Sequence, residues 1–176
     1  HVMRTHGGAK VRIDAPLGAG NEGVVFKGRL NGEAVALKLF KPDSTGRRQR
    51  RTRALVRMNL SQTLNSAIAG PFEDLLWEGR VGHIAPLVPG FSVQQLVDEP
   101  ALLSPRQRLM ATIKLGGLVA GMHRRGLAFG DLNKGAVKIE THGVHDVNVS
   151  LVDLDSSVLP GEPAPLTLGT PDTCAP

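Results

Sequence analysis

Three glycines near the start of the chain, Gly18, Gly20 and Gly23, have the spacing of a loop that can wrap around a phosphate group. Glycines suit such a loop because backbone N–H groups can approach the phosphate oxygens without a Cβ in the way. The same spacing occurs in dinucleotide-binding folds, where the glycines lead into a helix. Here residues 24–27 (VVFK) are typical of a strand, and Asn31-Gly32 is typical of a hairpin turn. The pattern therefore predicts a phosphate-binding loop between two strands.

Three charged residues further along the chain stand out by the sequence around them. Lys38 lies in the apolar run VALKLF, Asp131 lies in the loop sequence FGDLNKGA, and Asp153 follows the apolar residues LV. Phosphoryl transfer needs bound phosphates, neutralised charge and an oriented hydroxyl, and a glycine loop, a lysine and two carboxylates can supply these. The alternatives are a surface hairpin with a solvated lysine, and an aspartate that only closes an Asx turn.

The helices and strands that must position these residues are predicted from the spacing of hydrophobic residues and from the Gly, Pro and capping residues between them. Residues 10–42 predict three strands, and residues 45–68 predict a helix with Asp43 or Ser44 as its N-cap. The buried positions expected in this helix are Leu55, Met58, Leu60 and Leu64. Residues 72–76 and 83–88 predict short extended segments, and Pro89-Gly90 is the expected lobe boundary.

The second half of the chain predicts one long helix followed by two short strands. Ser104-Pro105 indicates a helix start, with serine as the cap and proline in the first turn, and the helix continues to Arg125-Gly126. Residues 136–140 and 147–151 predict the two strands. Residues 1–9 are interpreted as a cloning remnant or N-terminal extension and are left out of the predicted fold.

Composition narrows the class of protein. The chain has 176 residues, 41% of them hydrophobic, which suffices for one core or for two small lobes. Its formal net charge of +5 favours acidic partners, while 3% aromatic residues and no Tyr argue against a surface that stacks nucleic-acid bases. The single Cys174 excludes an internal disulfide, and no run predicts a membrane span or a signal peptide. We therefore expect a cytoplasmic protein without a nucleic-acid partner.

The ordered motifs resemble the protein kinase-like superfamily, and the GDL and DLDS sequences resemble bacterial Ser/Thr kinases of eukaryotic type. The resemblance implies an α+β fold, with an antiparallel β N-lobe carrying one helix at residues 10–90 and a reduced, mainly helical C-lobe at residues 91–176. Residues 169–176 (GTPDTCAP) resemble the end of an activation segment. The chain is shorter than a full kinase, so the resemblance implies a truncated kinase or a minimal one, like those that some bacteria inject into the host cytosol.

The resemblance also implies roles for individual residues, with ATP and Mg²⁺ as cofactors and protein Ser/Thr hydroxyls as acceptors. Lys38 would contact the α- and β-phosphates, Asp131 would orient the acceptor hydroxyl, and Asp153 would bind Mg²⁺. Lys134 is interpreted either as a contact to the transferring phosphate or as a solvated loop residue. The remaining cofactor-binding positions are Gly18, Gly20, Gly23, Val25 over the adenine, Ala36 and Val88.

The chain departs from the family pattern in its catalytic loop and in its first helix. Ala136 stands where an asparagine should help to hold a second Mg²⁺, so the enzyme is a silenced variant, works with one metal, or is inactive. Residues 45–68 contain no glutamate to pair with Lys38, which leaves Glu22, Glu73 and Asp74 as alternatives.

Two other departures bear on partners and regulation. Gly130 replaces the arginine that grips a phosphorylated activation loop, so we do not expect regulation by loop phosphorylation. The helix carries many arginines, which form either a solvated face or a docking surface for an acidic protein or lipid. These arginines are Arg47, Arg48, Arg50, Arg51, Arg53 and Arg57.

The sequence leaves two other functions open. A pseudokinase or nucleotide-binding scaffold is suggested by Ala136 and by the missing helix glutamate. A small-molecule phosphotransferase is suggested by the Gly130-Asp131-Leu132 motif, although the chain offers no large helical region for an acceptor site.

Overall fold

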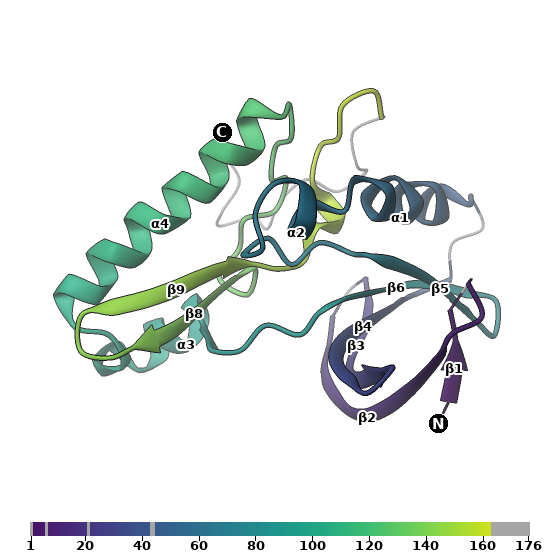
Figure 1. Ribbon diagram of the computed structural model, residues 1–176, viewed down its shortest axis with the longest axis horizontal. Helices are drawn as coiled ribbons and strands as arrows, with labels where there is room; N and C mark the ends of the chain where they lie inside the picture. Colours follow the sequence, from purple (N-terminus) through teal and green to yellow (C-terminus); the bar gives the residue numbers. More distant parts are fainter. Residues whose placement is uncertain (1, 6, 21, 43–44, 163–176) are drawn as a thin grey trace. The chain divides into compact units, whose positions relative to one another are not determined.

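The computed structural model describes residues 2–5, 7–20, 22–42 and 45–162, which form a mixed α/β structure with antiparallel sheets (Figure 1). The chain divides into two compact units. The first unit contains the described residues up to Leu60 together with Gly70–Leu87, and the second contains Ser61–Ala69 and the described residues from Val88 onward. The change of unit after Leu87 falls close to Pro89-Gly90.

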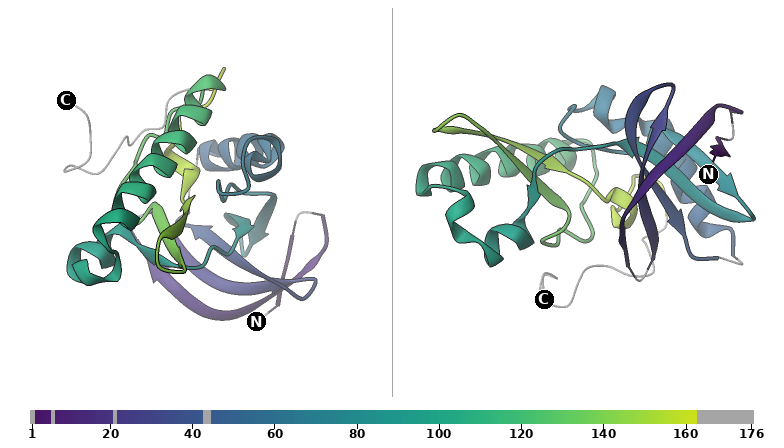
Figure 2. Two further views of the ribbon diagram at one scale, coloured as in Figure 1. Left: turned by 60° about the vertical axis from the view of Figure 1, so that its left-hand side comes forward. Right: turned by 90° about the horizontal axis from the view of Figure 1, so that it is seen from below.

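The first unit is built on a six-stranded antiparallel sheet with the order β1-β2-β3-β4-β6-β5. Figure 2 shows the ribbons of this sheet from two further sides. Its strands are β1 (Val2–Arg4), β2 (Lys10–Ala19), β3 (Gly23–Leu30), β4 (Glu33–Phe40), β5 (Glu73–Trp77) and β6 (Arg80–Pro86). The turn between β3 and β4 has positive φ at both Asn31 (51°) and Gly32 (90°), as a type I′ hairpin requires. The hairpin predicted from these two residues is confirmed.

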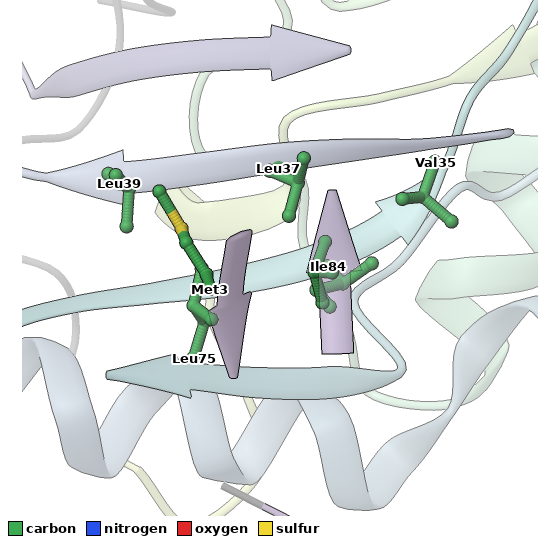
Figure 3. Packing of buried hydrophobic residues seen from close by; sticks show 7 residues of the cluster. Met3, Val35, Leu37, Leu39, Leu75 and Ile84 are labelled. Atoms are coloured by element: carbon green, nitrogen blue, oxygen red, sulfur yellow. The ribbon is translucent and has the colours of Figure 1, made fainter. Parts of the chain in front are cut away.

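Successive side chains of β4 point to opposite faces of the sheet, one facing the core and the other the candidate site. Val35, Leu37 and Leu39 point into the core, where Figure 3 shows them gathered with residues of β1, β5 and β6. Residues two apart in a strand share a face, so Ala36, Lys38 and Phe40 lie on the opposite face of β4.

Strand β1 corrects the treatment of the first residues, which the prediction left out of the fold. Met3 of β1 is only 1% exposed within the core, and Thr5 forms a bridge with Leu75 of β5. Because the Met3 side chain is buried in the core and the strand pairs with its neighbours, these residues belong to the fold.

The prediction of a single helix over residues 45–68 is wrong in its second half. Helix α1 (Arg47–Met58) ends at Asn59, which adopts the left-handed conformation (φ 43°) and whose N–H donates to the carbonyls of Leu55 and Val56. Asparagine tolerates this conformation at a helix end better than most residues. A short helix α2 (Leu60–Thr63) follows, and Ile68 then forms a parallel bridge with Leu151.

The expected details of this helix hold in part. Leu55 and Leu60 are buried, whereas Met58 and Leu64 are half-buried. The residue before the first turn is Gly46, which has φ 65° and no side-chain cap. The predicted caps, Asp43 and Ser44, lie outside the described residues.

The second unit packs one long helix against a three-stranded antiparallel sheet with the order β7-β8-β9. Its strands are β7 (Phe91–Ser92), β8 (Val137–His142) and β9 (Asp146–Leu151), and its helices are α3 (Val93–Asp98) and α4 (Pro105–Arg124), with 3₁₀ turns at Pro100–Leu102 and Leu154–Ser156. Figure 1 shows α4 running beside β9.

The start of α4 confirms the helix signal read from the sequence. Ser104 accepts from the Gln107 N–H, and the Gln107 side chain accepts from the Ser104 N–H, which forms a capping box with proline at the first helical position. In the described part of this unit, one long helix faces a sheet, so a mainly helical second lobe stays a prediction. Among the described residues no helix is both long and apolar enough to cross a membrane.

Candidate functional site

The three glycines of the predicted phosphate loop differ in what the fold requires of them. A Cβ on Gly23 would lie 2.1 Å from the carbonyl oxygen of Leu39, so glycine is needed there for β3 to approach β4. Gly18 and Gly20 have no described atom within 4 Å of an added Cβ, and neither has positive φ. Neither packing nor backbone conformation explains glycine at these two positions, whereas close approach of an external group would explain it.

Lys38 lies on the sheet face opposite the core. In the strand register it is flanked by Val25 of β3 and His83 of β6, and Ala36 precedes it on the same face. The Lys38 side chain is only 10% exposed. The structure thus brings three predicted cofactor-binding residues, Val25, Ala36 and Lys38, to one face beside the glycine loop. The fourth, Val88, is half-buried in the second unit, in the connection between β6 and β7.

The partner of Lys38, which the sequence left open among three acids, is Glu22 of the glycine loop. Its Oε2 atom lies 3.3 Å from the Lys38 Nζ atom. The other two candidates have different partners, because Asp74 pairs with Arg53 at 3.3 Å and Glu73 accepts from the Gly7 N–H at 3.4 Å.

The arginines of α1 do not share one environment. Arg48 Nη1 donates to the carbonyl of Glu22, and Arg53 pairs with Asp74, so both side chains turn toward the first unit's sheet. Arg50 and Arg57 are exposed. A docking surface for an acidic protein or lipid stays a prediction.

The predicted catalytic loop and the Asp153 segment are held side by side within the second unit. Ala128, just before the loop, exchanges two backbone hydrogen bonds with Val158, at 3.2 and 2.7 Å. At the other end of the loop, the Val152 N–H donates to the Ala136 carbonyl at 2.9 Å. These pairings fix both ends of residues 129–135 against residues 153–157.

Asn133 is a site residue that the sequence analysis missed. Its Nδ2 donates to Asp131 Oδ2 at 2.9 Å, while its Oδ1 accepts from the Gly135 N–H at 2.8 Å and from the Ala136 N–H at 3.1 Å. The Asx turn in this loop is therefore made by Asn133, which at the same time holds the Asp131 carboxylate. The signal was present in the sequence as the short polar residue two positions after Asp131.

Lys134 and Ala136 of the same loop differ in their exposure to solvent. Lys134 is exposed, and its carbonyl accepts from the Gln94 N–H at 3.2 Å. Ala136 is 1% exposed, so its methyl group is enclosed by protein.

Asp153 has the left-handed backbone conformation (φ 60°, ψ 56°), which is uncommon outside glycine and recurs at functional sites. Its side chain is exposed, whereas Asp155 is 9% exposed. Carboxylate oxygens of these two aspartates lie within 4.8 Å of each other. Paired hard oxygen donors are the ligand type that Mg²⁺ prefers, so this segment fits the metal that the sequence motif implies. The predicted activation-segment end at residues 169–176 lies outside the described residues.

Comparison with known proteins supports the fold. No protein-family model and no curated protein sequence matches this chain. Among solved structures, vaccinia related kinase 3 aligns with a TM-score of 0.63 at 14% identity, covering 89% of this chain and 51% of that kinase. The chain spans about half the length of that structure. At this identity the likeness establishes the fold, which is that of protein kinases, as the order of motifs predicted.

Proposed function

We propose that this chain is an ATP- and Mg²⁺-dependent kinase that phosphorylates Ser or Thr hydroxyls of proteins. The observation that carries the proposal is Lys38, a side chain only 10% exposed beside a loop whose Gly18 and Gly20 are not required by packing. Burying an ammonium group is costly, and a fold retains such a group where negative charge meets it. Glu22 is one such charge, and the triphosphate of ATP at the glycine loop would be another.

The residues of each unit have separate tasks in this proposal. In the first unit, Lys38 would hold the α- and β-phosphates, with Val25 and Ala36 beside the adenine. In the second, Asp153 and Asp155 would hold Mg²⁺, which supplies charge neutralisation to the phosphate oxygens. Val88 remains a proposed adenine contact, and Lys134 a proposed contact to the transferring phosphate.

Asp131 would act on the acceptor hydroxyl. The hydroxyl oxygen attacks the γ-phosphorus, the bond from that phosphorus to the leaving ADP oxygen breaks, and the hydroxyl proton passes to the Asp131 carboxylate. Asn133 contributes by fixing one carboxylate oxygen through its 2.9 Å hydrogen bond, which would orient the carboxylate toward the hydroxyl.

A nucleotide-binding scaffold is the second candidate, and the buried Ala136 favours it. A methyl group offers no metal ligand, and its 1% exposure leaves little room for a water molecule to replace one. A chain of this kind would bind nucleotide and never transfer phosphate.

Calorimetric titration of the whole chain with ATP and MgCl₂ tests the proposal. Lys38→Met should weaken binding by roughly 10- to 100-fold, as expected for a lost charge-assisted contact. Lys10→Met, at an exposed position of β2, is the matched control and should bind like the unaltered chain. Absence of binding to the unaltered chain would overturn the proposal.

Transfer is tested with [γ-³²P]ATP and a mixture of Ser- and Thr-containing protein substrates. Label on serine or threonine that is lost in Asp131→Asn supports the kinase. Binding without transfer, in the unaltered chain and in Ala136→Asn alike, favours the scaffold.

A further inference from the structure

One contact that holds Lys38 comes from the glycine loop itself. Glu22 stands between Gly20 and Gly23, and its carboxylate lies 3.3 Å from the Lys38 ammonium group. The two side chains differ in exposure, at 46% for Glu22 and 10% for Lys38. The more buried lysine therefore depends on where the loop places its glutamate.

The backbone of Glu22 is fixed from two sides. Its carbonyl accepts from the Lys41 N–H at 2.8 Å and from Arg48 Nη1 of α1 at 3.4 Å. Because Gly23 allows β3 to approach β4 closely, this end of the loop lies beside the end of β4, where Gly23 pairs with Phe40. The loop is thus anchored to a strand through its backbone and to a helix through one arginine side chain.

The same arginine also shares an aromatic ring with the lysine. The Arg48 guanidinium carbon lies 5.2 Å from the centroid of the Phe40 ring, and Lys38 Nζ lies 5.3 Å from it. Phe40 in turn packs edge-on against His83, with centroids 5.6 Å apart. Both cations lie within the distance at which a ring face attracts positive charge.

We propose that Arg48 and Glu22 are positioning residues for Lys38, so that α1 acts on the lysine through the glycine loop. Arg48 holds the Glu22 backbone, and the Glu22 carboxylate holds the lysine. The consequence for nucleotide binding rests on the proposed function, because it requires that Lys38 contact phosphate. The relay from helix to loop to lysine does not depend on that function.

The relay can be tested in the nucleotide-free chain by NMR of ¹⁵N-labelled lysine ammonium groups, with Lys38→Arg used to assign the Lys38 signal. We expect Glu22→Gln to speed exchange of the Lys38 ammonium protons with water about tenfold, since it removes a charged partner. Arg48→Gln should speed this exchange about threefold, since it removes one hydrogen bond to the loop. The effect of Arg48→Gln should vanish when Glu22 is already Gln, because the relay then has no second step.

Matched controls separate the relay from a general loss of charge. Arg57→Gln removes an exposed arginine from the same helix, and Glu33→Gln removes an exposed acid from the start of β4. Both should leave the Lys38 exchange rate unchanged. If Arg48→Gln does not fold, Arg48→Lys retains the charge and should give an intermediate rate. Exchange in Arg48→Gln equal to that in Arg57→Gln, or an undiminished Arg48 effect in the Glu22→Gln background, would overturn the relay.

Titration with ATP and MgCl₂ provides the second measurement. Glu22→Gln and Arg48→Gln should weaken binding severalfold while the two controls do not. If the unaltered chain binds no nucleotide, the proposed function fails while the NMR result still decides the relay. If the chain binds nucleotide and the NMR rates do not respond to Arg48→Gln, only the relay fails.

Discussion

The two candidate regions of this protein hold their charged side chains in different ways. The Lys38 side chain is 10% exposed, and its contact Glu22 lies 16 residues before it in the sequence. Arg48, which supports Glu22, lies 26 residues after Glu22. Asp131 is half-buried, and its contact Asn133 lies two residues away. The Lys38 side chain is thus held by residues distant in the sequence, and the Asp131 side chain by a residue of its own loop.

Because of this difference, we expect substitutions in the two regions to affect protein stability and phosphoryl transfer differently. Changes around Lys38 disturb strand pairing and helix contacts, so they should affect folding as well as binding. Changes at Asp131 and Asp153 of the second unit should affect transfer with little effect on folding.

Asp131→Asn should lower the rate of phosphoryl transfer by about 10²–10⁴-fold, since the amide cannot accept the hydroxyl proton. The amide oxygen can still accept the hydrogen bond from Asn133, so the loop should keep its structure. The midpoint of thermal unfolding and the affinity for ATP should therefore stay unchanged. A large drop in the unfolding midpoint would show that the Asp131 side chain, too, supports contacts with residues distant in the sequence.

Gly23→Ala and Gly20→Ala should separate the two tasks of the glycine loop. A Cβ at position 23 would meet the Leu39 carbonyl, so we expect a loss of unfolding free energy of about 1–3 kcal/mol or more. Gly20→Ala meets no described atom and should leave the free energy of unfolding unchanged or up to about 1 kcal/mol higher. It should instead weaken ATP binding about tenfold, through the backbone approach that it blocks. Denaturant unfolding and calorimetric titration measure the two effects, and equal destabilisation by both variants would contradict the assignment.

The same contrast explains how far the sequence could predict the structure. The Asn31-Gly32 hairpin and the Ser104-Pro105 helix start were predictable because each rests on local backbone preferences. The end of α1 at Asn59 was missed because apolar spacing continues through it, while one left-handed residue decides the outcome. The role of Met3 was missed because burial of a terminal strand depends on a partner far away in the sequence.

The site shows a similar division. The glycine loop, Lys38, Asp131 and Asp153 were identified from motifs that need only spacing. The choice among Glu22, Glu73 and Asp74 could not be made from the sequence, since it depends on which acid the sheet register and α1 bring to the lysine. Asn133 could have been identified, because an Asx turn involves only neighbouring residues.

Ala136→Asn tests the one enclosed position of the catalytic loop. The residue is 1% exposed, so an amide side chain there must either displace its neighbours or bury polar atoms. We expect a loss of about 1–3 kcal/mol in the free energy of unfolding, measured by denaturant titration. Ala136→Val serves as the control for volume. An Asn variant as stable as the unaltered chain would mean that this position can turn its side chain outward.

Asp146→Asn should have the smallest effect, because Asp146 lies at the start of β9, by the turn of the β8–β9 hairpin and away from Ala136 and Leu151 at its other end. Its carboxylate accepts from Lys114 Nζ at 2.8 Å and from the Val147 N–H at 2.9 Å, and these hydrogen bonds lower its pKa. A lowered pKa in the folded state stabilises the fold at pH values above the ordinary pKa of aspartate, and this stabilisation is lost as the pH falls through the folded-state pKa.

The expected difference in unfolding midpoint between Asp146→Asn and the unaltered chain is therefore slight at neutral pH and disappears in acid, because the group is exposed and screened by solvent. Thermal unfolding followed from neutral to strongly acidic pH measures it, with Glu33→Gln as an exposed control. Transfer activity should not change, because the contacts of Lys114 with Asp146 and Val147 connect α4 to β9. None of these contacts involves Asp131 or Asp153. Loss of transfer in Asp146→Asn would mean that the catalytic loop depends on the whole β8–β9 hairpin. The contrast between Asp131, held within its own loop, and Lys38, held by residues distant in the sequence, would then fail.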